Sequence, residues 1–276
     1  MTGPSARRSV ARRKPTLAGD LLRGWRTRRA LSQAALAADA GISARHLSYV
    51  ETGKAACSRE TLLQLAVALD LTLRDRNALL EAGGFARQYG ERELSAPELA
   101  EARRAIDLLL RRHEPFPGLV TDRRWNVIDT NAAARRLIGH VLGRERLARP
   151  INHMKLFLAP DDLRPHVEDW PRLAAALMAR ARHEAMAAPL DAPLQATWRE
   201  LSRYPGVTAP GDDVPGPLCE VRLRTPSQRI ALIGTVLTLG TPQDVTLQEL
   251  RVELFMPAEA ASEAALAALA AQDADR

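Results

Sequence analysis

The chain has few cysteines and lysines and lacks a long apolar run, and these shortages exclude several classes of protein. Its 276 residues include only two cysteines, Cys57 and Cys219, too few for a disulfide framework or a cysteine-based zinc site. The longest apolar stretch, 230–239, contains Gly and Thr and is much shorter than the roughly 18 residues of a membrane span. The first fifteen residues lack an apolar run of signal-peptide length. We therefore expect a cytoplasmic protein with no membrane partner.

Recognisable catalytic motifs are also missing. The sequence contains no HExxH, GxSxG, P-loop or GxGxxG pattern, and its histidines are too scattered to form a metal-ligand motif. We therefore predict a protein that is not an enzyme and holds no metal or cofactor. An enzyme remains an alternative, which a cluster of His113, His153 or His166 with Asp161 around a cleft would favour.

The segment 33–54, QAALAADAGISARHLSYVETGK, has the pattern of a helix-turn-helix. Ala37 is small where a second helix would cross close above it, and Gly41 suits a tight, left-handed turn between the helices. Leu47 and Val50 give the second helix an apolar face. The pattern alone also fits a simple αα-corner without a DNA-binding role.

The flanking sequence supplies the rest of a five-helix domain over residues 17–84. Leu17, Leu21 and Trp25 recur at helical spacing and predict a preceding helix. A later helix over 74–81 should close at the two glycines 83 and 84. Residues placed to cap the four later helices are Ser32, Ser43, Ser58 and Thr72.

Residues 17–84, with their SQAALAADAGIS and LSYVETGK segments, resemble the Cro-type or XRE family of bacterial DNA-binding domains. One departure is Cys57, where relatives often have proline. The resemblance implies an all-α, lambda-repressor-like domain whose third helix enters the major groove of a double-stranded operator. Base-facing positions fall on Ala44, Arg45, His46 and Tyr49, and phosphate or supporting positions fall on Gln33, Ser43, Ser48 and Lys54.

The charge distribution favours DNA binding. Residues 1–29 hold nine basic residues and one acid, a net charge of +8, whereas residues 93–276 hold 23 basic and 25 acidic residues. The positive excess therefore lies beside the helix-turn-helix, as binding to phosphates requires. Residues 1–16 form a predicted disordered basic arm, which either contacts DNA or is only a solvated tail.

A linker over 85–94 should separate this domain from a second one over 95–260, followed by a C-terminal helix or tail over 261–276. Ser95, Pro97 and Glu98 predict a helix start. The apolar stripe of that helix is Leu99, Ile106, Leu109 and Leu110. The stripe is short for a coiled coil, so packing on the second domain is favoured over pairing of two subunits.

Beyond residue 117 the pattern changes to an α+β domain. GLVTDRRWNVID predicts two short strands, with Trp125 and Val127 on one face, and 218–224, 229–239 and 247–256 predict three more. Strand 229–239 is apolar on both faces and should be central, while 247–256 alternates and should be half-exposed. The expected helices are 131–138, 152–158, 163–167, 171–186 and 194–204, and a Pro/Gly-rich loop, 204–217, follows them.

Three segments of this region, PFPGLVTDRRWNVIDTNAAARRLIG, LRPHVEDWPRLAAALMARAR and TVLTLGTPQDVTLQELRVELFMP, resemble the MmyB-like ligand-binding domain. That family has a PAS-like fold, an antiparallel sheet with inserted helices. The resemblance implies a pocket between sheet and helices that holds a fatty-acid-like molecule.

The residues themselves suggest a pocket wall or an ordinary core. The apolar candidates are Trp125, Val127, Leu173, Leu177, Met178, Trp198, Leu232 and Phe255. Arg180 lies within the inward stripe of its helix, where it could bind a carboxylate, but reaching water or pairing with Glu184 is the favoured alternative. Asn131 is either a polar pocket residue or a helix cap.

Together these features predict a transcription regulator that acts as a homodimer on an operator and senses a small apolar or acyl ligand. An alternative is a DNA-binding repressor whose C-terminal domain serves only dimerisation or partner docking; a solid core without a cavity would favour it.

Overall fold

The computed structural model describes residues 17–189, 191–207, 219–240 and 242–274, which form two compact units. One unit comprises the residues up to 91 together with 243–245, and the other comprises 92–242 and the residues from 246 onward. The predicted basic arm, 1–16, and most of the predicted loop 204–217 lie outside the described residues.

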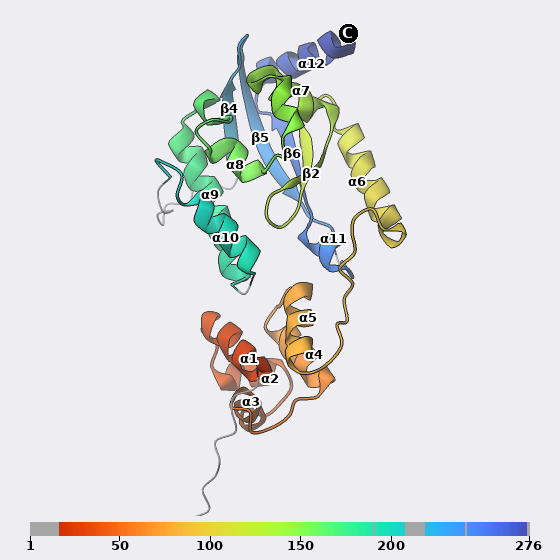
Figure 1. Cartoon of the computed structure of the whole chain (residues 1–276), viewed down its shortest axis with the longest axis vertical. Helices are drawn as coiled ribbons and strands as arrows, with labels where there is room; N and C mark the ends of the chain where they lie inside the picture. Colours follow the sequence, from red (N-terminus) through yellow and green to blue (C-terminus); the bar gives the residue numbers. More distant parts are fainter. Residues whose placement is uncertain (1–16, 190, 208–218, 241, 275–276) are drawn as a thin grey trace, which may run out of the picture. The chain divides into compact units, whose positions relative to one another are not determined.

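The N-terminal unit is built from the five expected helices. They are α1 (Leu17–Arg28), α2 (Gln33–Asp39), α3 (Ala44–Glu51), α4 (Arg59–Ala68) and α5 (Leu73–Ala82) (Figure 1). Each helix from α2 to α5 begins at a side-chain oxygen that accepts a first-turn backbone N–H, and the four capping residues are Ser32, Ser43, Ser58 and Thr72. The capping predictions are confirmed.

The core of this unit fixes the angle between α2 and α3. Trp25 of α1, Ala37 of α2 and Leu47 of α3 are buried in one cluster. Gly41, between the two helices, has φ +68°, the left-handed conformation that glycine adopts without steric cost. Gly19 of α1 lies so close to the end of α3 that an added Cβ would stand 2.5 Å from the Val50 carbonyl oxygen. The glycine at position 19 therefore allows α1 to approach the end of α3 closely, a contact that the sequence analysis did not predict.

The C-terminal unit contains one six-stranded sheet in which every neighbouring pair is antiparallel. Its order is β2-β1-β6-β5-β4-β3. The strands are β1 (Gly118–Thr121), β2 (Val127–Thr130), β3 (Val167–Glu168), β4 (Cys219–Arg224), β5 (Arg229–Leu237) and β6 (Arg251–Pro257). The expected central strand, β5, lies between β6 and β4.

Helices before, between and after these strands complete the α+β architecture. The α-helices are α6 (Ala100–Arg112), α7 (Ala132–Leu142), α8 (His153–Leu158), α9 (Trp170–Ala187), α10 (Ala192–Leu201), α11 (Val245–Glu249) and α12 (Ala260–Ala274). Short 3₁₀ turns are η1 (Pro97–Leu99), η2 (Arg144–Ala148) and η3 (Arg164–His166). None of the helices in the described part of the chain combines the length and apolar character needed to cross a membrane.

Two separate clusters cover the sheet. The larger one joins α7, α8, α9, α10 and α12 to β1, β4, β5 and β6. In the smaller one, Ile106 and Leu110 of α6 pack on Val120 and Val252. Figure 1 shows α6 beside the β2 end of the sheet and α9 beside the β4 end. Helix α6 therefore packs on its own domain, as favoured from the sequence.

Several local predictions in this domain were wrong. Ser95 does not cap the first helix; its hydroxyl donates to Glu93, and the 3₁₀ turn η1 begins after Ala96 without a side-chain cap. Leu109 is 41% exposed because the buried stripe of α6 passes through Ile106 and Leu110 instead. Trp125 belongs to the turn before β2, with φ +62°, and its side chain is fully buried.

Two other boundaries also differ. The predicted helix 163–167 is the short turn η3 followed by strand β3, which pairs with β4 and was not expected. The predicted strand 247–256 begins only at Arg251, because 245–249 form α11. Along β6, moreover, Glu253 is 3% exposed and Met256 is 40% exposed. The expected alternation of buried apolar and exposed polar residues is therefore wrong for this strand.

Candidate functional site

Helix α3 presents a polar face to solvent because its apolar face is fixed in the core. Leu47 and Val50 are buried, and Ser43 caps the helix by accepting the His46 N–H at 3.1 Å. Of the residues predicted to meet DNA, Ser43, Ala44, Arg45 and Lys54 are exposed, and Gln33, His46, Ser48 and Tyr49 are half-buried. The predicted positions on and around α3 are thus all at least partly exposed.

Two cations gather around one phenol ring on this surface. Arg45 Nε donates a hydrogen bond to the Tyr49 hydroxyl at 3.0 Å, and its guanidinium carbon lies 5.4 Å from the ring centroid. Lys54 Nζ lies 5.9 Å from the same centroid. Cation–π contacts of this kind weakly stabilise the positions of exposed side chains. Since the bond to Tyr49 uses one of the five N–H groups of Arg45, the others can serve a ligand.

A buried carboxylate ties α3 to the two helices before it. Glu51 is 3% exposed, and it accepts two hydrogen bonds from Arg26 of α1, at 2.7 and 3.0 Å. It also accepts one from Gln33 Nε2 at 2.7 Å. The hydrogen bond to Glu51 raises the pKa of Arg26. Gln33 therefore makes a hydrogen bond within the protein, and its predicted contact with DNA stays a prediction.

The C-terminal domain contains a cavity of about 380 Å³ between the sheet and helices α8 and α9. Its wall is mainly apolar. The lining residues are His153, Phe157, Leu173, Ala176, Leu177, Arg180, Val221, Gly234, Thr235, Val236, Glu253 and Phe255. This volume is within the range of small-molecule binding sites. The domain therefore lacks the solid core without a cavity that would favour a role only in dimerisation or partner docking.

Arg180 does not offer a free cation to this cavity. Its terminal nitrogens donate to both oxygens of Glu253, at 2.7 and 3.2 Å, and its Nε donates to Glu184 at 3.1 Å. The two carboxylates raise the pKa of Arg180 against the opposing effect of burial. Pairing with Glu184, the alternative weighed from the sequence, is therefore present.

His153 lines both the cavity and a smaller apolar space. The ring packs edge-on against Phe157 and Phe255, with centroid separations of 5.5 and 5.9 Å. These three side chains also line a space of about 40 Å³, whose other walls include Leu137 and Leu232. Neither ring nitrogen of His153 has a hydrogen-bond partner among the described residues. Burial lowers the pKa of His153, so the ring is neutral near pH 7.

The other predicted pocket residues occupy different places. Leu173, Leu177, Arg180 and Phe255 line the larger cavity and Leu232 the smaller one. Trp125, Val127, Met178 and Trp198 line neither and belong to the surrounding core. Asn131 caps α7, with its side-chain oxygen accepting the Ala134 N–H at 2.9 Å. The wall residues that sequence reasoning missed include Glu253, whose place in an alternating strand pattern gave no sign of burial.

The residues named for the enzyme alternative do not form a metal cluster. Within the described ranges, no three His, Cys, Asp or Glu side chains come close enough to hold a metal ion. A ring nitrogen of His113 lies 3.1 Å from the Phe255 carbonyl oxygen, and His153 lies in the cavity wall. His166 is half-buried and Asp161 is exposed.

Comparison with known families agrees with both halves of this description. The family model described as "MmyB-like transcription regulator ligand binding domain" matches residues 102–269, more than half of the chain. The chain belongs to the MmyB-like transcription regulators. Residues 17–79 of this MmyB-like regulator match a helix-turn-helix domain, so its N-terminal unit is a DNA-binding domain. The two families are regulatory.

One solved structure and the curated proteins complete the comparison. The MmyB-like regulator is similar to the restriction-modification controller protein C.AhdI from Aeromonas hydrophila, at 36% identity over 22% of this chain and 92% of that chain. The TM-score is 0.21, so the likeness carries no argument about fold. No curated protein matches the chain significantly.

Proposed function

We propose that the protein is a one-component transcription regulator that binds an operator through α3 and a small apolar or acyl ligand in the cavity of its C-terminal domain. The observation that carries the DNA half is the group of Arg45, Tyr49 and Lys54 on the exposed face of a capped, well-anchored helix. The net charge of +8 in residues 1–29 supports it, because phosphate binding supplies much of the affinity of such proteins for DNA.

Arg45 is the proposed base-reading residue. A guanidinium can donate two hydrogen bonds to guanine O6 and N7, a pair that contributes about 1–3 kcal/mol of discrimination. We expect Arg45→Ala to relax the preference at one base position by about that amount. The measurement is the affinity of the full-length protein for an operator selected from random sequences and for its single-base variants.

Lys54→Ala is the matched control, because Lys54 is proposed to contact phosphate. Its loss should weaken binding to all sequences alike and leave the preference unchanged. Both side chains are exposed, so neither change should alter the thermal unfolding of the protein. An unaltered base preference in Arg45→Ala would remove Arg45 from the reading set.

A homodimer is the proposed form on DNA. Helix-turn-helix dimers place their recognition helices in successive major grooves, so the two half-sites should lie about one helical turn, roughly 34 Å, apart. Footprinting of the operator, together with the mass of the protein in solution, tests this arrangement. A single short asymmetric protected site bound by a monomer contradicts it.

The ligand half rests on the cavity of about 380 Å³, which favours a sensor over a domain that only dimerises. Ligand binding would change DNA affinity only to the extent that it differs between two states of the protein. Denaturing extraction followed by mass spectrometry tests for a bound molecule in the full-length protein, with residues 1–92 as the control. A stoichiometric apolar compound only in the full-length sample supports the proposal. A cavity that takes up no apolar compound, even when such compounds are added, contradicts it.

A further inference from the structure

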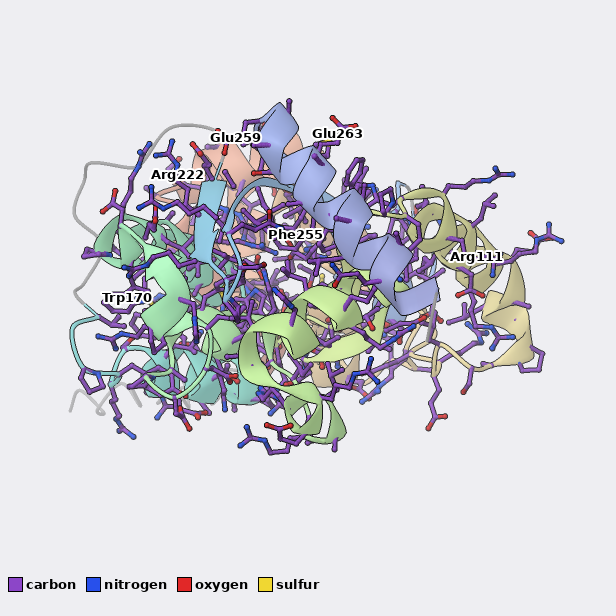
Figure 2. The ribbon with its side chains drawn as sticks, turned by 90° about the horizontal axis from the view of Figure 1, so that it is seen from above. Arg111, Trp170, Arg222, Phe255, Glu259 and Glu263 are labelled. Carbon is purple, nitrogen blue, oxygen red and sulfur yellow. The ribbon has the colours of Figure 1, made fainter. Side chains whose placement is uncertain are left out.

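The C-terminal domain has a second hollow, a groove of about 580 Å³ lined by residues of α7, η2 and α12. Figures 1 and 2 both show α12 next to α7. None of the residues that line the groove also lines the cavity between the sheet and helices α8 and α9. A hollow of this volume can hold a small molecule, so the groove is a candidate site distinct from the cavity.

The wall of the groove is basic. Arg135 and Arg136 of α7 and Arg144 of η2 line it, whereas no Asp or Glu does among the side chains that the structure describes. Arg136 pairs with Glu114, which stands outside the lining, so the charge of Arg136 is balanced within the protein. Arg135 forms no ion pair with any of the described side chains. The groove therefore has a positive charge at Arg135 that these side chains do not balance.

Two neutral acceptors hold Arg135 in place. Its Nη1 donates to the backbone oxygen and to the hydroxyl of Thr130, at 2.6 and 2.8 Å. These bonds use two of the five N–H groups of a guanidinium, and those on Nε and Nη2 stay available to a ligand. Because Arg135 is exposed, an anion can reach it from solvent without displacing a charged partner. A side chain that is already oriented also loses less conformational entropy on binding.

We propose that the groove binds a small molecule that carries two or more phosphate groups, a ligand chemically unlike the apolar one. A planar guanidinium can donate two parallel hydrogen bonds to phosphate oxygens, and Arg135 has donors for such a pair. Arg144 adds a second cation to the wall, which favours a ligand with more than one phosphate. Leu147 and Leu269 offer an apolar contact to the organic part of a nucleotide.

A nucleotide and a free polyphosphate share this chemistry. The size of the groove favours either of them over an acidic segment of another protein, because stable protein interfaces extend over roughly 800 Å² of each partner. The acidic segment is therefore the alternative that the experiment has to exclude.

The test follows the amide chemical shift of Gly139, which lines the groove, in nuclear magnetic resonance spectra of the full-length protein. A local signal is needed because the basic residues of 1–29 also attract anions. The probes are ATP, tripolyphosphate, adenosine and hexaglutamate, at constant ionic strength and without divalent cations. ATP and tripolyphosphate should each bind about tenfold or more tightly than hexaglutamate, since a flexible peptide loses more conformational entropy on binding. Adenosine should not bind detectably.

Arg135→Ala should weaken the binding of tripolyphosphate about tenfold, because it removes a charged pair of donors. The side chain is exposed, so the variant should fold as the unaltered protein does. Arg111→Ala is the matched control, because Arg111 is an exposed arginine of α6, which Figure 2 shows to one side of α7 and α12. The control removes the same charge and should leave the affinity unchanged.

Three results would overturn this inference. The first is a Gly139 signal that responds to neither ATP nor tripolyphosphate. The second is hexaglutamate binding as tight as that of tripolyphosphate, which would assign the groove to acidic segments. The third is an equal loss of affinity in Arg135→Ala and Arg111→Ala, which would indicate diffuse attraction to a basic surface. Tighter binding of ATP than of tripolyphosphate supports a nucleotide, and equal binding supports phosphate recognition alone.

Discussion

Glu51→Ala should lower the free energy of unfolding of the N-terminal domain by about 2 kcal/mol, because it leaves the half-buried Arg26 without its partner. The carboxylate of Glu51 accepts hydrogen bonds from Arg26 and Gln33. The side chains of Glu51 and Arg26 are only 2% and 14% exposed. Hydrogen exchange of the full-length protein, followed by mass spectrometry of peptides from 17–84, measures the loss where it occurs.

Asp39→Ala is the control for this change. Asp39 is also an acid in the same domain, but it is exposed at the end of α2, and surface changes usually alter stability by less than about 0.5 kcal/mol. If Glu51→Ala leaves the hydrogen exchange of α1 and α3 as slow as in the control, the hydrogen bonds of Glu51 with Arg26 and Gln33 are not what holds these helices together.

Asn131→Ala should destabilise the C-terminal domain by about 3 kcal/mol or more, since it leaves several buried backbone groups unpaired. The side-chain oxygen of Asn131 accepts the N–H groups of Gly118 and Ala134, at 3.0 and 2.9 Å. Its Nδ2 donates to the Phe116 carbonyl at 2.7 Å. One side chain thus caps α7 and joins it to the start of β1. Chemical denaturation monitored by circular dichroism measures the effect.

Asn131→Asp separates the cap from the bridge. The carboxylate keeps the acceptor for Gly118 and Ala134 and loses the Nδ2 donors to Phe116 and Leu110, so the loss of stability should be smaller than in Asn131→Ala. Equal losses of stability in the two variants would show that the hydrogen bonds donated by Asn131 Nδ2, and not the cap of α7, account for most of the stabilisation.

The N-terminal domain was predictable because its signals are local. Ser32, Ser43 and Ser58 cap helices that begin at the next residue, and a cap depends only on a side chain and the N–H groups three residues later. Gly41 likewise adopts the turn conformation that its own neighbours require. Each of these interactions joins residues close in sequence.

The cavity was less predictable because its wall is assembled from distant segments. Arg180 and Glu253 lie 73 residues apart, and their pairing depends on how α9 packs on β6. The alternation along β6 predicted exposure of its polar residues, but helices cover both faces of the sheet, so Glu253 is buried among apolar side chains. His153 was considered only as a possible catalytic residue because nothing local distinguishes a pocket histidine from any other.

The Arg26–Glu51 pair has a consequence for how DNA binding responds to ionic strength. Dissolved ions screen buried charges much less than exposed ones, so added salt should leave the contact between α1 and α3 intact. Phosphate contacts made by exposed cations weaken steeply as the salt concentration rises, because the release of counterions on binding then contributes less free energy. Raising the salt concentration should therefore release the operator from a domain that stays folded, and the slope of that dissociation would count phosphate contacts without interference from unfolding.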